Sequence, residues 1–225
     1  MAIKPILFNT EMVRAILDGR KTCTRRLVKF LPGENSQWTG YIKDGLMLYN
    51  GRNEPCIRKV PYQPGDIMYV RETWQYLYEL DGNEQIIEGT GKYYYAATDT
   101  IPFDTYVDAS GVTHERVPWH PSIHMPKEAA RIWLKVTDVR VERLQEITPK
   151  GAESEGVGNL FYDDIGYGEK NYGTEVDPEY GIAKEQFAWL WESTIKKSDL
   201  DRYGWDANPW VWVIEFERCE KPEGV

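Results

Sequence analysis

The spacing of hydrophobic residues changes several times along the chain, and each pattern predicts a different element. Between residues 9 and 19 the apolar residues recur at i, i+1, i+4 and i+5, on one side of a helix: Met12, Val13, Ile16 and Leu17. Asn9 or Thr10 can cap the first amides, and Gly19 can end the helix in a left-handed conformation. We therefore expect a helix here, preceded by a short strand at Ile6–Phe8.

Alternating apolar and polar residues predict strands at 20–30, 67–72, 130–144 and 209–220. In the strand at 20–30, Lys21, Cys23 and Arg25 would lie on one face, and Thr22, Thr24 and Arg26 on the other. The strand at 67–72 follows a turn at 64–66 that contains Pro and Gly.

Two more helices are expected, at 147–156 and 183–195. The first has Thr148 as its cap, Pro149 at its first position and Gly156 beyond its end. The remaining segments are read as short strands at 31–60, a hairpin within 75–99, and an acidic surface loop at 158–182. Strands dominate and no regular βαβ alternation is found, so the pattern favours a small barrel or an α+β domain, with mainly β structure, over a doubly wound sheet.

Composition narrows the class of protein. The chain has 225 residues, with nine Trp and fifteen Tyr, which is enough to bury a core. No apolar run approaches the ~18 residues of a membrane helix, and the first residues lack the pattern of a signal peptide. Three widely spaced cysteines without a CxxC pair are typical of a reduced, cytoplasmic protein.

Charge is distributed unevenly along the chain. The net charge of −9 disfavours a general nucleic-acid coat protein. Residues 1–60, however, hold eleven Lys and Arg against five Asp and Glu, whereas residues 61–225 hold sixteen against thirty-one. Either a local basic face attracts a phosphate-bearing ligand, or the acidic loops serve solubility.

Lys21 and Thr24 are the first candidates for chemistry. A threonine hydroxyl attacks only when a base takes its proton, and a lysine can do so when desolvation or a neighbouring cation lowers its pKa. Arg20, Arg25 and Arg26 could supply that cation or bind phosphate. In a regular strand Lys21 and Thr24 would point to opposite faces, so a shared site needs a bend or bulge between them. The alternative is a solvated, charged strand.

The other candidate residues indicate a functional site less specifically. Cys23 is either a thiolate favoured by the flanking cations or a small buried strand residue. His120 and His124 are spaced like a helical metal pair, but the prolines around them disfavour a helix. Glu153 and Glu155 end the short helix, where the dipole favours a protonated carboxyl; the alternative is a pair of exposed carboxylates. Several aromatic residues could stack on a base or belong to the core: Trp38, Tyr41, Tyr69, Trp74, Trp119 and Trp133.

Four blocks together resemble the ASCH domain family, which comprises small PUA-like β-barrels related to RNA-binding modules. The blocks are ILDGRKTCTRR at 16–26, PGDIMYVRETW at 64–74, 131–157 and 208–219, which cover about a third of the chain. The chain is similar to phage- or prophage-borne members. The resemblance implies a single domain over 1–225, a PUA-like small β-barrel with a few helices, and long insertions at about 31–60, 75–125 and 158–200.

One branch of this family is an amidohydrolase that removes the acetyl group from N(4)-acetylcytidine. Its catalytic set matches Lys21, Thr24 and Glu155, which implies a threonine nucleophile, a lysine base and a glutamate proton carrier. The expected function is thus metal-independent hydrolysis of an N-acylated nucleobase or nucleoside, in the host cytoplasm if a phage encodes the protein. Arg20, Arg25, Arg26 and Trp74 are the expected binding residues, and no metal or cofactor is expected.

Two other functions stay open. The first is a non-catalytic module that binds RNA or single-stranded nucleic acid, and the second is a metal-independent ribonuclease with the same pocket. Glu155 separates binding from catalysis, because a phosphate groove gains nothing from a carboxylate, whereas an amidase needs a proton carrier. The long insertions are absent from the compact amidohydrolase, so the resemblance supports the pocket more strongly than the substrate.

Overall fold

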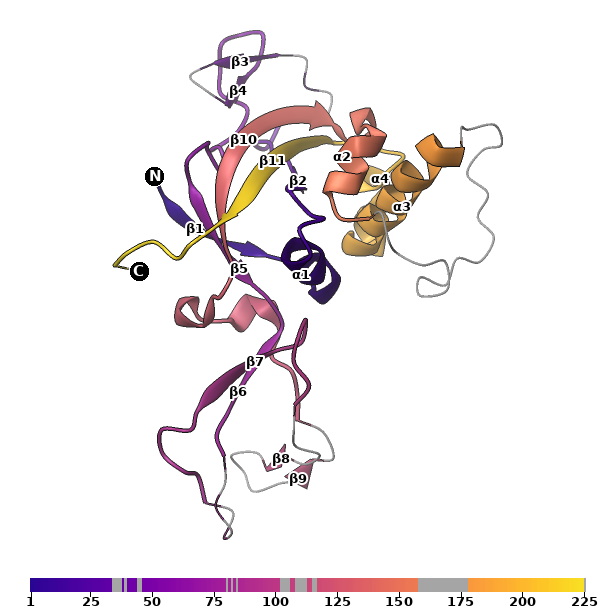
Figure 1. The fold of residues 1–225 in the computed structure, drawn as a ribbon. Helices are drawn as coiled ribbons and strands as arrows, with labels where there is room; N and C mark the ends of the chain where they lie inside the picture. Colours follow the sequence, from indigo (N-terminus) through magenta and orange to yellow (C-terminus); the bar gives the residue numbers. More distant parts are fainter. Residues whose placement is uncertain are drawn as a thin grey trace. The chain divides into compact units, whose positions relative to one another are not determined.

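The computed structural model describes residues 1–33, 38, 40–43, 46–79, 81, 83, 85–101, 106–107, 113–114, 117–157 and 178–224 (Figure 1). The chain divides into two compact units. The first unit comprises Met1 with residues 18–66 and 135–217, and the second comprises residues 2–17, 67–134 and 218–225. Each unit is described by itself.

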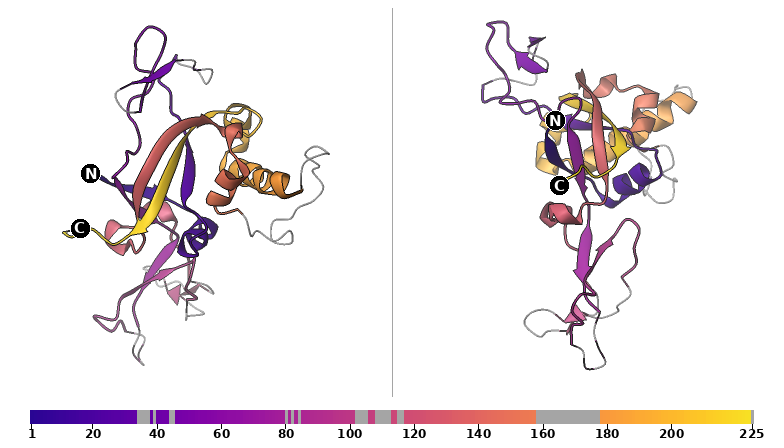
Figure 2. Two further views of the ribbon diagram at one scale, coloured as in Figure 1. Left: turned by 45° about the horizontal axis from the view of Figure 1, so that its top comes forward. Right: turned by 60° about the vertical axis from the view of Figure 1, so that its left-hand side comes forward.

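The first unit contains an antiparallel sheet. Its strands are β10 (Trp133–Arg143, from Lys135 on), β11 (Trp210–Cys219, up to Glu217) and β2 (Cys23–Leu27), hydrogen-bonded in that order. Figures 1 and 2 both show β10 and β11 side by side. In the pairing of β2 with β11, Thr24 lies opposite Ile214. A separate ribbon in this unit pairs β3 (Tyr41–Lys43) with β4 (Met47–Tyr49).

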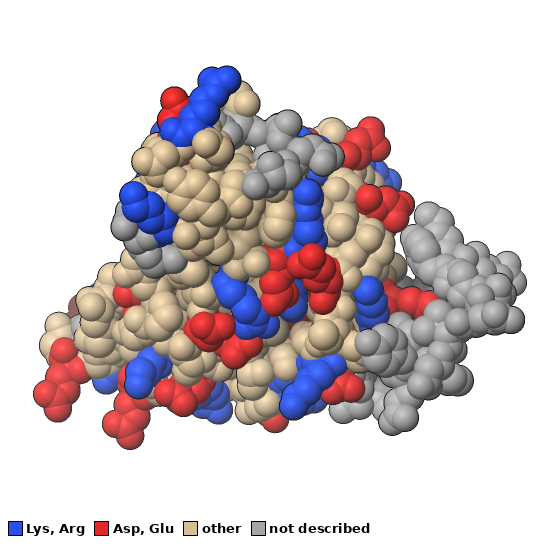
Figure 3. All heavy atoms as spheres, turned by 90° about the horizontal axis from the view of Figure 1, so that it is seen from above, with Lys and Arg blue, Asp and Glu red and all other residues tan. Residues whose placement is uncertain are grey.

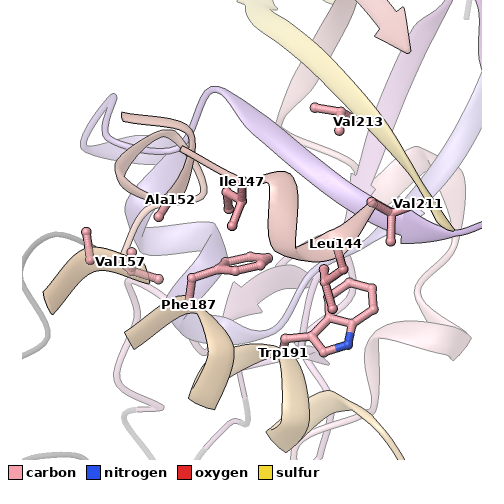
Figure 4. Close-up of a cluster of buried hydrophobic side chains, with 9 residues drawn as sticks. Leu144, Ile147, Ala152, Val157, Phe187, Trp191, Val211 and Val213 are labelled. Atoms are coloured by element: carbon pink, nitrogen blue, oxygen red, sulfur yellow. The ribbon is translucent and has the colours of Figure 1, made fainter. Parts of the chain in front are cut away.

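Helices of the first unit build its core next to this sheet. They are α2 (Pro149–Ser154), α3 (Pro178–Thr194) and α4 (Leu200–Tyr203), with one-turn 3₁₀ helices η3 (Leu144–Glu146) and η4 (Lys197–Asp199). Figure 4 shows Phe187 and Trp191 of α3 pointing toward Leu144 and Ile147. These side chains form one buried cluster with Ala152, Val157, Ala183, Val211 and Val213. The cluster fixes α2 against α3, and α2 carries the segment that leads to Glu155.

The second unit is built on parallel pairing of β1 (Ile3–Leu7) with β5 (Ile67–Arg71). It also contains α1 (Thr10–Leu17), the hairpin β6 (Trp74–Leu77) and β7 (Lys92–Tyr95), and the ribbon β8 (Tyr106–Val107) and β9 (Thr113–His114). Short 3₁₀ helices η1 (Ser122–His124) and η2 (Lys127–Ala129) follow. Met125 and Trp133 are central in the buried cluster of this unit.

The coarse α+β class is confirmed: the described elements are mostly strands with few helices. The sheets are open, and no closed barrel forms within the described ranges. The reason is that strands from the long segments pair with each other, as the ribbons β3–β4, β6–β7 and β8–β9, and do not continue the main strand order. None of the described helices has the length and apolar character needed to cross a membrane.

Most expected elements are found. Asn9 caps α1 by accepting from the Met12 amide at 2.8 Å, and Gly19 has the left-handed φ of 76° expected after that helix. The prediction of a surface loop over 158–182 is wrong for its last five residues, because α3 begins at Pro178. The rest of that segment, 158–177, lies outside the described residues.

Candidate functional site

The segment before β2 is held by residues at the end of α2. Lys21 forms an isolated antiparallel bridge with Glu155, and the Thr22 amide donates to the carbonyl of Ser154 at 2.8 Å. Regular pairing with β11 begins only at Cys23. The Thr22 carbonyl still accepts from the Phe216 amide of β11 at 2.9 Å, so these contacts give no evidence of the bend that the sequence predicts between Lys21 and Thr24.

Lys21 and Glu155 form a buried ion pair. The Lys21 ammonium donates to Glu155 Oε2 at 2.6 Å and to the Glu155 backbone carbonyl at 2.9 Å. The two side chains are 0% and 3% exposed. A buried ion pair needs such additional hydrogen bonds, because both charges lose their hydration. The structure therefore brings together two of the three residues expected to be catalytic.

Arg25 reaches the same carboxylate from the strand. Its Nη1 donates to Glu155 Oε1 at 3.2 Å, and its Nη2 donates to Glu142 Oε2 at 3.4 Å. The guanidinium lies 5.7 Å from the centre of the Phe187 ring, and the side chain is 2% exposed. Glu155 thus accepts from cations at both carboxylate oxygens. Arg25, expected as a binding residue, is buried in this ion-pair network.

Thr24 lies on the opposite face of β2 together with Arg26. The Thr24 side chain is fully buried, and its Oγ1 accepts from Arg26 Nη1 at 2.7 Å. Burial lowers the pKa of Arg26 below its ordinary value, while Glu155 and Tyr62 oppose that shift. A cation bound to a hydroxyl oxygen stabilises negative charge on that oxygen, which is what a nucleophile needs.

Cys23 is not a reactive thiolate. Its thiol is buried, and burial raises its pKa from 9.0 to about 12. The negative charge of Glu155 adds to that increase, whereas the flanking cations Lys21 and Arg25 oppose it. Burial therefore overturns the hypothesis of a thiolate and leaves Cys23 as a small residue in the strand.

The other candidates have contacts of their own, outside the ion pairs of Glu155. Arg20 donates to the carbonyl of Gly156 at 2.9 Å and pairs with Asp18 at 3.0 Å, so it holds the turn before Lys21. Glu153 is exposed. Trp74 belongs to the second unit, where its ring packs 5.2 Å from His120.

Two hollows open on the first unit near these residues. One, of about 350 Å³, is lined by hydroxyl and charged groups: Thr22, Cys23, Arg25, Thr137, Arg140, Thr148, Lys150, Gly151, Ser154, Glu215 and Phe216. The other is a cleft of about 570 Å³ between residues 26–32 and 57–61, with Trp212 also in its wall. We call it the basic cleft. It contains Arg26, which links it directly to the Thr24 hydroxyl.

Sequence reasoning missed Glu142 and the 57–61 wall of the basic cleft. Glu142 lies in β10, where the alternating pattern predicts that an acidic residue faces solvent. The wall at 57–61 is joined to 26–32 by a bridge between Phe30 and Ile57, a pairing that no local pattern indicates. Comparison of the chain with models of protein families, with curated proteins and with solved structures finds no match.

Proposed function

We propose that the protein is a metal-independent amidohydrolase acting on an N-acylated nucleobase or nucleoside, such as N(4)-acetylcytidine. The observation that supports it most is the buried pair of Lys21 and Glu155, joined at 2.6 Å. A binding surface for phosphates gains nothing from a carboxylate there, whereas acyl transfer needs a group that accepts and returns a proton. The choice of substrate rests on the family resemblance.

Thr24 is the nucleophile of the proposed reaction. Its oxygen attacks the acyl carbonyl carbon while the hydroxyl proton passes to the Lys21–Glu155 pair. This transfer requires the Thr24 hydroxyl, which contacts Arg26 on the other face of β2 in this structure, to turn toward the pair when substrate binds. Arg26, already 2.7 Å from this oxygen, stabilises the charge that develops there. The C–N bond then breaks, and the leaving nucleobase amine takes the proton from the pair.

The second half of the reaction regenerates the enzyme. Water attacks the acyl ester on Thr24, the pair accepts the water proton, and the carboxylic acid leaves as the Thr24 hydroxyl is restored. A proton can move from the Lys21 amine to Glu155 along one short hydrogen bond without leaving the pair, so Lys21 gains the free amine that a base requires. Both side chains are buried, which keeps bulk water from competing for that proton.

The test is hydrolysis of N(4)-acetylcytidine in excess chelator, followed by loss of the absorbance of the acylated base. Thr24→Val keeps the shape of the side chain but removes the hydroxyl, and Thr24→Ser keeps a hydroxyl. We expect wild-type turnover, a loss of about 10³-fold or more in Thr24→Val, and partial activity in Thr24→Ser. Unchanged turnover in Thr24→Val rejects the threonine nucleophile.

A wild-type protein that leaves N(4)-acetylcytidine intact rejects this amidohydrolase. The same preparation is then incubated with a single-stranded RNA in chelator. Cut strands would identify the metal-independent ribonuclease, and intact but bound strands would identify the non-catalytic binding module.

A further inference from the structure

Three basic side chains around the basic cleft have no charged or hydrogen-bonded partner among the described residues. Lys29, Arg58 and Lys59 form no ion pair or side-chain hydrogen bond with any residue that the structure describes, and all three are exposed. Unpaired exposed cations are not rare in this unit, because Lys150, Lys196 and Lys197 also form no ion pair among the described residues. Arg140, in contrast, contacts Asp138, Glu142 and Glu215, and in the middle of the face drawn in Figure 3 basic and acidic side chains lie against one another. What distinguishes Lys29, Arg58 and Lys59 is that they lie around one hollow.

The unpaired cations converge on one hollow. With Arg26 they give the basic cleft four positive side chains, and no Asp or Glu is found among the described residues that line it. The rest of its wall is apolar: Leu27, Phe30, Leu31, Pro32, Ile57, Pro61 and Trp212. Like charges placed close together repel one another, and an anion bound between them relieves that repulsion, although water and salt weaken it for exposed groups.

The walls of the cleft are fixed by backbone pairing. Phe30 bridges Ile57, and the Leu31 amide donates to the carbonyl of Cys56 at 2.8 Å. On the other side Arg26 lies opposite Trp212 in the pairing of β2 with β11. The cleft is thus largely preformed, and its volume of about 570 Å³ lies in the ~300–1,000 Å³ range of small-molecule sites.

We propose that the basic cleft binds the phosphate group of a nucleotide and that the substrate is a phosphorylated nucleoside, not the free nucleoside. This rests on the proposed function for its chemistry, since Arg26 connects the cleft to Thr24. Lys29, Arg58 and Lys59 contact the phosphate, and the apolar wall accommodates the base and sugar. The phosphate belongs either to a mononucleotide or to an RNA strand.

The experiment measures binding without turnover. Cytidine, cytidine 5′-monophosphate and a short single-stranded cytidine oligonucleotide are titrated into the protein by calorimetry, at two salt concentrations. The variant is Lys29→Gln/Arg58→Gln/Lys59→Gln, and its matched control is Lys196→Gln/Lys197→Gln, which removes exposed lysines elsewhere in the same unit. Circular dichroism verifies that both variants fold.

We expect the monophosphate to bind at least about tenfold more tightly than cytidine, because its phosphate can form charge-assisted hydrogen bonds that cytidine lacks. The triple variant should lose that difference and the control should keep it. If the oligonucleotide binds more tightly still, with a steeper salt dependence, the phosphates come from a strand. Equal binding of cytidine and the monophosphate, or an unaffected triple variant, overturns the proposal.

The outcome is separable from that of the hydrolysis assay. Turnover of N(4)-acetylcytidine with no preference for the monophosphate removes the phosphate site and leaves the amidohydrolase. Tight binding of the monophosphate that the triple variant loses, without any turnover, supports the phosphate site and rejects the amidohydrolase.

Discussion

Lys21 and Glu155 are joined twice, because the Lys21 ammonium donates both to the carboxylate and to the backbone carbonyl of the same residue. The carbonyl contact ties the lysine to the end of α2 even when the carboxylate exchanges a proton. The ion pair is therefore held in position by a bond that does not depend on the charge of Glu155. This arrangement suits a pair that accepts and returns a proton.

Breaking this pair should destabilise the fold strongly. Lys21→Met and Glu155→Gln should each lower the free energy of unfolding in urea by about 3–5 kcal/mol, because each leaves a buried charge uncompensated. The double variant should lose clearly less than the sum of the two. Lys197→Met, at an exposed lysine, should change the value by less than about 0.5 kcal/mol. Additive losses in the double variant would show that the pair is not coupled.

Substitution by Gln should lower mainly the stability of the fold at Arg25 and mainly the turnover at Arg26, its neighbour in β2. Arg25→Gln removes contacts to Glu155 and Glu142 and should cost about 3–5 kcal/mol of stability. Arg26→Gln loses the hydrogen bond to Thr24, which is worth about 1 kcal/mol in stability, but should reduce turnover at least about tenfold. Urea unfolding and the hydrolysis assay, run on both variants, measure the two effects. An Arg26→Gln protein with full activity is incompatible with the role given to Arg26.

Stability should fall at alkaline pH because of Cys23. Its pKa is raised from 9.0 to about 12, so between these values the folded protein keeps a proton that the unfolded chain loses. The free energy of unfolding should therefore decrease by at most ~1.4 kcal/mol per pH unit between about pH 9 and 12. Tyr95, whose pKa is also raised to about 12, adds a slope of the same sign.

The contribution of Cys23 is isolated by comparison with Cys23→Ala, which keeps Tyr95. Urea unfolding from pH 8 to 11 should give a shallower decrease for the variant than for the wild type. Parallel curves would mean that the Cys23 thiol titrates normally in the folded protein.

Gly151 should matter more for the site than for the helix that contains it. A Cβ at this position would lie 3.3 Å from Arg25 Nη2 and 3.2 Å from Thr148 Oγ1. Arg25 is fixed by two carboxylates, so Gly151→Ala should cost roughly 1 kcal/mol, although alanine is the better helix former. Turnover should also fall. Glu153→Ala, at an exposed position of the same helix, should leave turnover unchanged and the free energy of unfolding within ~0.5 kcal/mol of the wild type. A Gly151→Ala protein that is more stable than the wild type would contradict the prediction.

Local signals predicted local structure well. Thr148, Pro149 and Gly156 mark the ends of α2 because caps, a proline at the first turn and a left-handed glycine act within a few residues. The alternation that predicts a strand at 130–144 agrees with β10, in which Leu134 and Val136 are buried. The closed barrel was expected from the number of strands and from the resemblance, and strand pairing, which is non-local, gave open sheets instead.

The site was predictable in part. Lys21 and Glu155 are 134 positions apart, so their contact was expected from the family pattern and not from spacing. The burial of Arg25 could not be predicted, because it depends on Glu142 and Phe187 from two other elements. The cations of the basic cleft come from segments whose approach is fixed only by tertiary pairing.

Pairing of β2 with β11 also has a consequence for biosynthesis. Thr24 lies opposite Ile214, so two segments about 190 residues apart must meet before the site exists. During translation at ~5–20 residues per second, β2 leaves the ribosome many seconds before its partner strand. Throughout that interval β2 lacks the strand that pairs with it, although Glu142 and Glu155, the ion-pair partners of Arg25, have already been made. The sheet of the first unit is completed only after β11 has been made, and a nascent chain stalled before β11 should have no hydrolytic activity.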